Sequence, residues 1–414
     1  MNTIKRVPSI FLIICLVGFP QISETIYTPS LPDLAKSLGI QVSLAELTLS
    51  IYFIGFALGV FAYGILADAI GRKKALLLGI AVYILGSLGC GFSSSIGMLL
   101  FFRFVQAFGA SAGSVVTQTI LRDLYTGKER SKIFAVVSGA LGFSPAIGPL
   151  LGGAIDELLH WRWNFYALVV MGVMLLGVCT LRLVETKLPS QNQSKKSCKD
   201  IVKLMKCMLS DPRVLCYAMI IAICNGIMFS YYAEAPFIFI EVIKLSPGQY
   251  GILGLVVALS FFIASYLSIK CNTYFQSERT ITFGGGVSCL GAGLLAIICS
   301  LARISPDQSI TVWIAMLLSI ACIFIGIAIM IPNCLSNALV GYEQYSGTAA
   351  SLLGLFYYCF IAIFTALMSY LHDGTVLAMP LYFFVLSAST VVLGTLLQNV
   401  FVMPELAQIG HSNK

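Results

Sequence analysis

The chain has 414 residues, of which 58% are hydrophobic and only 10% are charged, and its formal net charge is +7. Soluble globular proteins carry about 25% charged residues, so this composition excludes a soluble globular domain. A helix that crosses a bilayer needs about 20 apolar residues, and the chain holds enough of them for about twelve such helices.

Long apolar stretches separated by polar turns occur twelve times along the chain. The first six have cores at residues 9–26, 47–66, 75–94, 98–119, 133–155 and 165–183. The other six have cores at residues 214–240, 252–269, 282–301, 310–331, 347–371 and 381–403. These stretches are too long and too uniformly apolar for the alternating strands of a membrane barrel. The predicted fold class is therefore an all-α integral membrane protein with twelve transmembrane helices.

A lysine-rich polar segment at residues 185–212 separates residues 1–184 from residues 213–414, and we expect a six-helix bundle on each side of it. Cytoplasmic loops collect Lys and Arg. With the N-terminus placed inside, 20 of the 25 Lys and Arg residues fall on the inner side, 4 in outer loops and 1 within a span. We therefore expect both termini and the linker to be cytoplasmic. The positive net charge then reflects topology, and we expect no nucleic-acid partner.

The first apolar run follows Lys5 and Arg6, as in a secretory signal peptide, but it continues to about Ile26 without a small-residue cleavage pattern. We expect an uncleaved first helix.

An enzyme needs clustered reactive side chains, and the sequence offers few. His160, His372 and His411 are isolated, and the glycine-rich stretches lack the lysine and strand of a phosphate-binding loop. The 13 cysteines form no CxxC or mixed Cys/His cluster. We expect a protein that is not an enzyme, with no cofactor, no metal site and no disulfide. A membrane enzyme or a non-transporting sensor is the alternative class.

The loop between the second and third spans reads GILADAIGRKK, from Gly64 to Lys74. Asp68 and Arg72 are four residues apart and can meet if the end of the span stays helical. Gly71 allows a tight turn. The alternative is an ordinary positive loop with a fortuitous acid.

Arg103 lies within the fourth predicted span, in the sequence RFVQAFGASAG. A charge at that depth costs about 2.5–3.5 kcal/mol on the insertion scale, so Arg103 should face a cavity or a partner. The alternative is a structural arginine bonded to backbone carbonyls.

The fifth span carries small and helix-kinking residues that allow close helix approach. They are Ser144, Pro145, Gly148, Pro149, Gly152 and Gly153. A generic packing face is the alternative interpretation.

These three stretches resemble signature motifs of the major facilitator superfamily, with Ala107 in the fourth-helix motif and Ser144 in the antiporter motif where glycine is usual. Residues 21–34, 121–125 and 161–163 are similar to the Bcr/CflA and EmrD branch of drug:proton antiporters. The second half matches weakly, through residues 231–237 and 245–251, and its loop at residues 270–279 lacks the Gly and Asp of the first-half signature.

The resemblance implies two six-helix bundles around a cavity near the midplane, and alternating access as the mechanism. It implies a conformational gate made of Gly64, Asp68, Gly71, Arg72, Arg122 and Asp123. It also implies proton-driven efflux of amphipathic compounds across a bacterial inner membrane. The expected partners are a small-molecule substrate, protons and the lipid bilayer, and we expect a monomer. Export of an endogenous metabolite such as a siderophore or nucleoside, or facilitated uptake, are the alternatives.

The candidate residues of the substrate cavity are mostly aromatic, which suits varied apolar ligands. They are Tyr27, Tyr52, Phe53, Gln106, Tyr231, Tyr232, Asn333, Tyr357 and Tyr358, together with Arg103. Acids within spans are costly and often functional, so Glu24 and, more weakly, Glu234 are the candidates for the coupling proton. Each could instead be an interface carboxylate that faces water, in which case Asp33, or Arg103 with water, would take that role.

Overall fold

The structure is a computed structural model, and it describes residues 8–125, 129, 133, 136–137, 144–187, 198–301, 309–342 and 346–402. Every regular element in these residues is a helix. The first half of the chain contains α1 (Ile10–Thr25), η1 (Thr28–Ser30), α2 (Leu31–Leu38), α3 (Val42–Ile70), α4 (Arg72–Phe92), α5 (Ile96–Leu124), α7 (Ser144–Leu158) and α8 (Trp161–Arg182).

The second half begins after α9 (Cys198–Ser210). It contains α10 (Pro212–Pro236), η2 (Phe237–Val242), α11 (Pro247–Tyr274), α12 (Ser277–Leu301), α13 (Ile310–Asn337), α14 (Ser346–Leu371), α15 (Ala378–Leu396) and η4 (Leu397–Val402). Both η2 and η4 are single π-helical turns that continue the preceding helix.

Eleven helices among the described residues are long and apolar enough to cross a membrane. They correspond to all the predicted spans except the fifth, of which the structure describes the last part as α7. The predicted all-α membrane fold class is confirmed.

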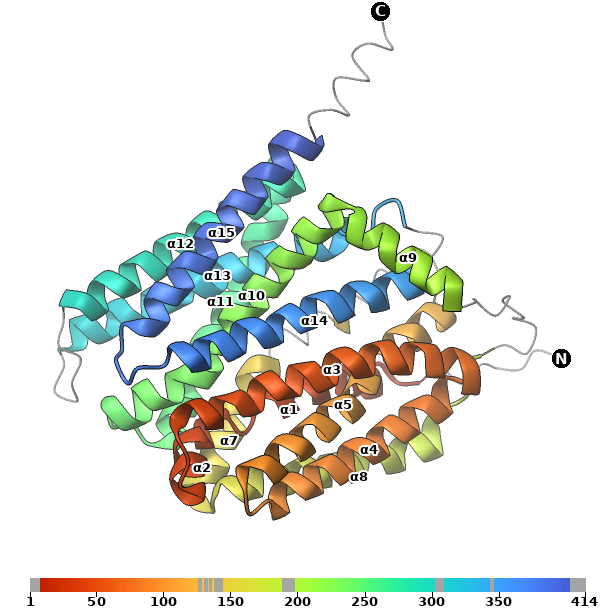
Figure 1. Cartoon of the computed structure of the whole chain (residues 1–414), viewed down its shortest axis with the longest axis horizontal. Helices are drawn as coiled ribbons and strands as arrows, with labels where there is room; N and C mark the ends of the chain where they lie inside the picture. The colour runs from red at the N-terminus through yellow and green to blue at the C-terminus, as the bar shows by residue number, and fades with distance from the viewer. Residues whose placement is uncertain are drawn as a thin grey trace, which may run out of the picture.

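The two halves lie side by side (Figure 1). In the first half α4 packs on α5 and α8, and α5 packs on α3; in the second half α12 packs on α13 and α15. Two long helix pairs join the halves: α14 lies along α3, and α11 lies along α7. The junction between the halves is therefore built mainly from these four helices.

Consecutive spans run antiparallel, so α3 and α5 end where α4, α10 and α14 begin. We call this the basic end, because Arg72, Lys73 and Arg122 lie there. At the opposite end, here called the far end, α3 begins and α10 and α14 finish. Each functional side chain can be placed by its distance along a helix from one of these two ends.

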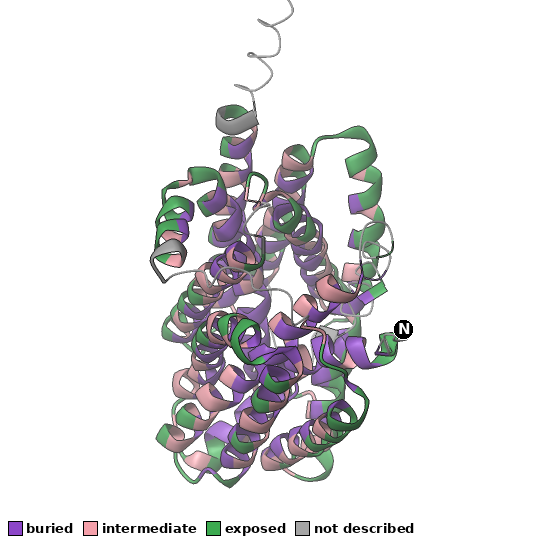
Figure 2. Ribbon diagram, turned by 90° about the vertical axis from the view of Figure 1, so that its right-hand side faces the viewer, coloured by how far each residue is buried: buried purple, intermediate pink, exposed green. Residues whose placement is uncertain are grey.

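Large apolar side chains are exposed along the outer faces of the helices, for example Phe11 (75% exposed), Leu181 (86%) and Tyr370 (85%). Figure 2 shows exposed residues on the periphery and buried residues inside the bundle. A monomer in water rarely exposes so much contiguous apolar surface, whereas a hydrocarbon environment accommodates it.

The predicted polar linker contains the amphipathic helix α9. Leu204 and Met208, four residues apart, are buried, whereas Lys203 and Lys206 are exposed. The helix packs on α10 and α14. The spacing of the apolar residues predicts such a helix. The sequence analysis considered only the number of lysines and therefore predicted a polar linker.

Candidate functional site

Arg103 in α5 is fully buried in an aromatic cage. Its guanidinium carbon lies 4.1 Å from the centre of the Tyr27 ring and 4.4 Å from that of Tyr52. A third ring, that of Phe165 in α8, lies 5.9 Å away. Cation–π attraction strengthens when the cation is removed from water, so these ring faces replace part of the lost hydration.

Hydrogen bonds fix the arginine in this cage. Arg103 Nη1 donates to Gln106 Oε1 at 2.6 Å, and Gln106 Nε2 donates to Ser87 Oγ at 2.8 Å. The Tyr27 hydroxyl pairs with Thr48 Oγ1 at 2.9 Å. Arg103 Nε and Nη2 have no hydrogen-bond partner among the described residues. The guanidinium therefore keeps the N–H groups of two nitrogens for a further acceptor.

Glu24, in the last turn of α1, is only 4% exposed. It is electrostatically coupled to Arg103, and to Tyr357 and Tyr358 of the second half. The structure thus places this carboxylate inside the bundle, where it connects the buried arginine with the junction between the halves.

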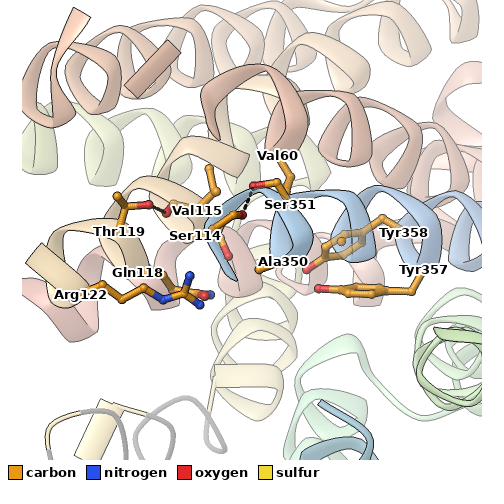
Figure 3. Close-up of a pocket in the computed structure, with 12 residues that line it drawn as sticks. Val60, Ser114, Val115, Gln118, Thr119, Arg122, Ala350, Ser351, Tyr357 and Tyr358 are labelled. Atoms are coloured by element: carbon orange, nitrogen blue, oxygen red, sulfur yellow. Dashed lines mark hydrogen bonds between the residues drawn. The ribbon is translucent and has the colours of Figure 1, made fainter. Parts of the chain in front are cut away.

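A pocket lies between the two halves and extends from the basic end toward the middle of the helices. Its walls come from α3, α5 and α14, and Tyr357 and Tyr358 line one side of it while Gln118 and Arg122 line another (Figure 3). The remaining lining residues are Val60, Ser114, Val115, Thr119, Gly347, Ala350, Ser351 and Gly354. The pocket therefore offers phenol rings on one side and polar groups with a cation on the other.

The other predicted cavity residues separate into two groups. Phe53 of α3 stacks on Tyr358, with ring centres 6.3 Å apart, and thus lies at the junction of the halves near the pocket. Tyr231 packs on Tyr232 and on Phe324 of α13. Asn333 accepts a hydrogen bond from Asn272 at 2.8 Å, within the second half. Among the predicted cavity residues, Tyr357 and Tyr358 line the described pocket.

The charged residues at the basic end form a network within the first half. Arg72 Nη1 lies 3.1 Å from Asp68 Oδ1, and Arg72 Nε lies 2.9 Å from Asp123 Oδ2. Gly71, with φ +101°, provides the turn between α3 and α4. The structure brings together these predicted gate residues, while Arg122 of the same set lines the pocket and Gly64 lies against Ser351 of α14.

Glu185 belongs to this network and was missed by the sequence analysis. Its carboxylate accepts hydrogen bonds from the backbone N–H groups of Arg72 at 2.8 Å and Lys73 at 3.2 Å, at the start of α4. A helix N-terminus carries free N–H groups and a positive dipole end, which a carboxylate satisfies. The position of an acidic residue just after the sixth span is the sequence feature that could have indicated this role of Glu185.

The glycines of α7 allow close contact with two other helices. A Cβ at Gly148 would collide with Thr25, and one at Gly152 with the carbonyl oxygen of Ile26, both at the end of α1. A Cβ at Gly153 would collide with the carbonyl oxygen of Pro247 in the second half. Pro149 also lies on this face, against Gly251 of α11. The Ser144 and Pro145 side chains of this predicted motif lie outside the described residues.

At the far end, three side chains from both halves meet in a group that we call the far-end cluster: Glu46, Glu234 and His372. His372 Nδ1 lies 2.8 and 2.9 Å from the two carboxylate oxygens of Glu234, and 3.8 Å from Glu46 Oε1. The 2.8 Å separation is a hydrogen-bond distance. Two ligands of one tetrahedral zinc ion would stand about 3.3 Å apart, given metal–ligand distances of about 2.0 Å. His372 and Glu234 therefore form a hydrogen-bonded pair, and one ligand atom from each of the three residues lies within 4.8 Å of the others.

The sequence analysis proposed Glu234 but missed Glu46 and His372. Each stands alone in the sequence, and His372 is 138 residues from Glu234. Only the pairing of α3 with α10 and α14 brings them together.

Two further contacts join the halves at the far end. Lys36 Nζ lies 3.0 Å from Glu241 Oε1. Glu157 Oε2 accepts hydrogen bonds from Ser246 Oγ at 3.1 Å and from the Gly248 N–H at 3.0 Å. The far end is therefore closed across the junction.

Comparison with known proteins agrees with the helical membrane fold. The sequence model described as Major Facilitator Superfamily matches residues 11–366. A protein of Rickettsia bellii named an uncharacterized transporter is 36% identical, over 94% of this chain and 96% of its own length. A chloramphenicol resistance protein of Pseudomonas aeruginosa is 29% identical, over 89% and 85% of the two chains. The fold resembles that of the xylose transporter XylE from E. coli, in a partially occluded inward-open conformation, with TM-score 0.71 at 13% identity over 95% and 98% of the chains.

Proposed function

Because this chain belongs to the major facilitator superfamily, and is thus a multi-pass secondary transporter, we propose that it exports amphipathic small molecules in exchange for protons. The proposed site is not catalytic. Residues 1–184 and 213–414 act as two six-helix bundles, joined by the linker at residues 185–212. The basic end faces the cytoplasm of a bacterial inner membrane, since Lys and Arg collect there.

The observation that carries this proposal is the buried Glu24 beside Arg103 and the junction tyrosines. With Glu24 ionised, its charge attracts the guanidinium. A substrate that donates a hydrogen bond to the ionised carboxylate would be displaced when Glu24 takes up a proton, while Arg103 Nε and Nη2 stay available to a substrate acceptor. Proton and substrate would then occupy Glu24 in turn, which is what exchange requires.

The pocket supports the substrate class. Tyr357 and Tyr358 present ring faces to an apolar group, while Gln118 and Arg122 present polar groups nearer the basic end. An amphipathic molecule entering from the cytoplasm matches this order of surfaces. The similarity to a chloramphenicol resistance protein supports export, and the branch we propose is that of the Bcr/CflA and EmrD antiporters.

A transport assay in inverted membrane vesicles tests the proposal. With the vesicle interior made acidic, the wild-type protein should concentrate radiolabelled chloramphenicol, and Glu24→Gln should bind chloramphenicol but fail to concentrate it. Glu234→Gln, the second predicted coupling residue, is assayed in parallel. If both variants concentrate chloramphenicol as the wild type does, neither carboxylate couples the proton.

The alternatives are separated by comparing cells with and without the protein. Increased tolerance to drugs supports drug export. Accumulation of a metabolite in the medium without a change in tolerance would instead indicate an exporter of an endogenous compound, and uptake of a solute down its gradient would indicate a facilitative importer.

A further inference from the structure

The far-end cluster links the two halves through buried ionisable groups. Glu46 lies in the first turns of α3, in the first half, and is 0% exposed. Glu234 lies near the end of α10 and is 1% exposed. His372 follows α14, and its partly exposed ring packs against Phe237 with ring centres 5.9 Å apart. Separation of the halves at this end would pull Glu46 away from the other two residues.

The charges within the cluster do not balance unless one more positive charge is present. The hydrogen bond to Glu234 raises the pKa of His372, which favours a protonated imidazole beside this carboxylate. Glu46 shares the same imidazole at the longer distance of 3.8 Å, and both its carboxylate oxygens are buried without a hydrogen-bond partner among the described residues. An ionised carboxylate buried in that way is strongly unfavourable, whereas the neutral acid is not.

The surrounding charges favour an additional proton. Asp373 follows His372, and hydrogen bonds from Thr375 hold the pKa of Asp373 below its usual value. Glu241 of η2 also faces the cluster, but Lys36 of α2 pairs with it. These groups, from each neighbouring segment, leave an excess of negative charge around the cluster.

We propose that Glu46, Glu234 and His372 form a proton-binding site that takes up one proton when the two halves close at the far end. When the halves separate, water reaches Glu46 and the proton returns to the far side. Protons on that side therefore stabilise the closed far end, because a ligand shifts an equilibrium toward the state that binds it better. A proton that enters and leaves on the same side does no transport work, so this site is distinct from the coupling group proposed at Glu24.

Hydrogen exchange can measure this closure without any substrate. The full-length protein in lipid nanodiscs is labelled between pH 5.5 and pH 8, and exchange in segments 31–46 and 234–246 is followed by mass spectrometry after correction for intrinsic rates. One linked proton should change the ratio of closed to open forms by up to about tenfold per pH unit. We expect protection of both segments to increase toward acid pH in the wild-type protein.

Two amide variants remove the need for the extra proton. Glu46→Gln leaves the balanced pair Glu234 and His372, and Glu234→Gln leaves Glu46 opposite His372. Each is expected to keep both segments protected with little change across the pH range. Should one variant fail to fold, the other still tests the proposal.

The matched control is His160→Gln. His160 pairs with Asp33 at 3.4 Å, also at the far end, but both residues belong to the first half. This variant should show the wild-type pH dependence. A wild-type protein whose protection does not depend on pH would overturn the proposal, as would either amide variant that keeps the wild-type dependence. Loss of protection on adding EDTA would also overturn it, because the positive charge would then come from a metal ion.

Discussion

The two ends of the bundle are held by different kinds of contact. At the basic end, Arg72 pairs with Asp68 and Asp123, all within the first half. At the far end, Glu46 and Lys36 of the first half face His372 and Glu241 of the second. The pocket between the halves lies toward the basic end. Among the described residues, the ion pairs of Arg72 at the basic end therefore stabilise the first half, while the far-end ion pairs join the two halves.

The ion pairs of the strongest sequence motif lie within the first half, although Gly64 at its start lies against Ser351 of the second half. The loop from Gly64 to Lys74 organises α3, α4 and the end of α5. Across the junction, Gly64 and Gly153 of the sequence motifs make close contacts, while Glu46 and His372 belong to no recognised motif. Substitutions at the two ends and in the core between them should therefore have different effects.

Replacement of Arg103, which lies between the two ends, should have the largest effect. Arg103→Ala removes the charge held by Tyr27, Tyr52 and Gln106. We expect transport in vesicles to fall by about 100-fold, equivalent to about 2.7 kcal/mol. Arg103→Lys should retain part of the activity, since an ammonium lacks the planar fork of a guanidinium. Full activity of the alanine variant would assign Arg103 a structural role at most.

Gly153→Ala should open the far end. The new methyl group would collide with the carbonyl oxygen of Pro247 across the junction, and overpacking of this kind costs about 1–3 kcal/mol. Hydrogen exchange at the start of α11 should accelerate accordingly. Gly177→Ala is the control, because a Cβ at Gly177 would meet nothing within 4 Å. Equal exchange in the two variants would contradict the close contact between α7 and α11.

Asp68→Asn should slow transport without loss of folded protein. Arg72 would lose its pair with Asp68 but keep Asp123 and the carbonyl oxygen of Ala67. Because Asp68 is 65% exposed, the lost ion pair stabilises the fold by only about 1 kcal/mol or less. We expect a several-fold lower rate in purified vesicles. A wild-type rate would show that Asp68 has no part in the conformational gate.

Glu157→Gln should have the smallest effect. The amide oxygen can still accept from Ser246 and Gly248, and an exposed charge in this position is worth about 1 kcal/mol or less. We expect transport within about twofold of the wild type and slightly faster hydrogen exchange at the start of α11. If hydrogen exchange at the start of α11 accelerated as much as in Gly153→Ala, the Glu157 contact, and not the close packing of α7, would hold the far end together.

The sequence predicted the helical membrane fold because long apolar runs allow few alternatives in lipid. It also predicted local pairs: Asp68 and Arg72 meet because four residues bring side chains to one face of a helix. Tyr27, Tyr52 and Gln106 were grouped with Arg103 as candidates, and the structure gathers them around it.

The far-end cluster could not be predicted in this way. Glu46 and His372 meet only because α3 pairs with α14 across the junction, and no periodicity within one helix encodes that pairing. Glu185 was not predicted as part of the basic-end network, for a related reason. Its partners are backbone N–H groups of another helix, and every residue except proline has such a group, so no residue type indicates the contact.

The position of Arg103 also has a consequence for biosynthesis. Its ring and hydrogen-bond partners, Tyr27, Tyr52, Gln106 and Phe165, all belong to the first half. The cost of placing a guanidinium in the bilayer can therefore be recovered as soon as α8 has been inserted, while the ribosome is still translating the second half. A nascent chain that stops after α8 should consequently hold its arginine in the membrane, and the later helices would assemble against a finished surface.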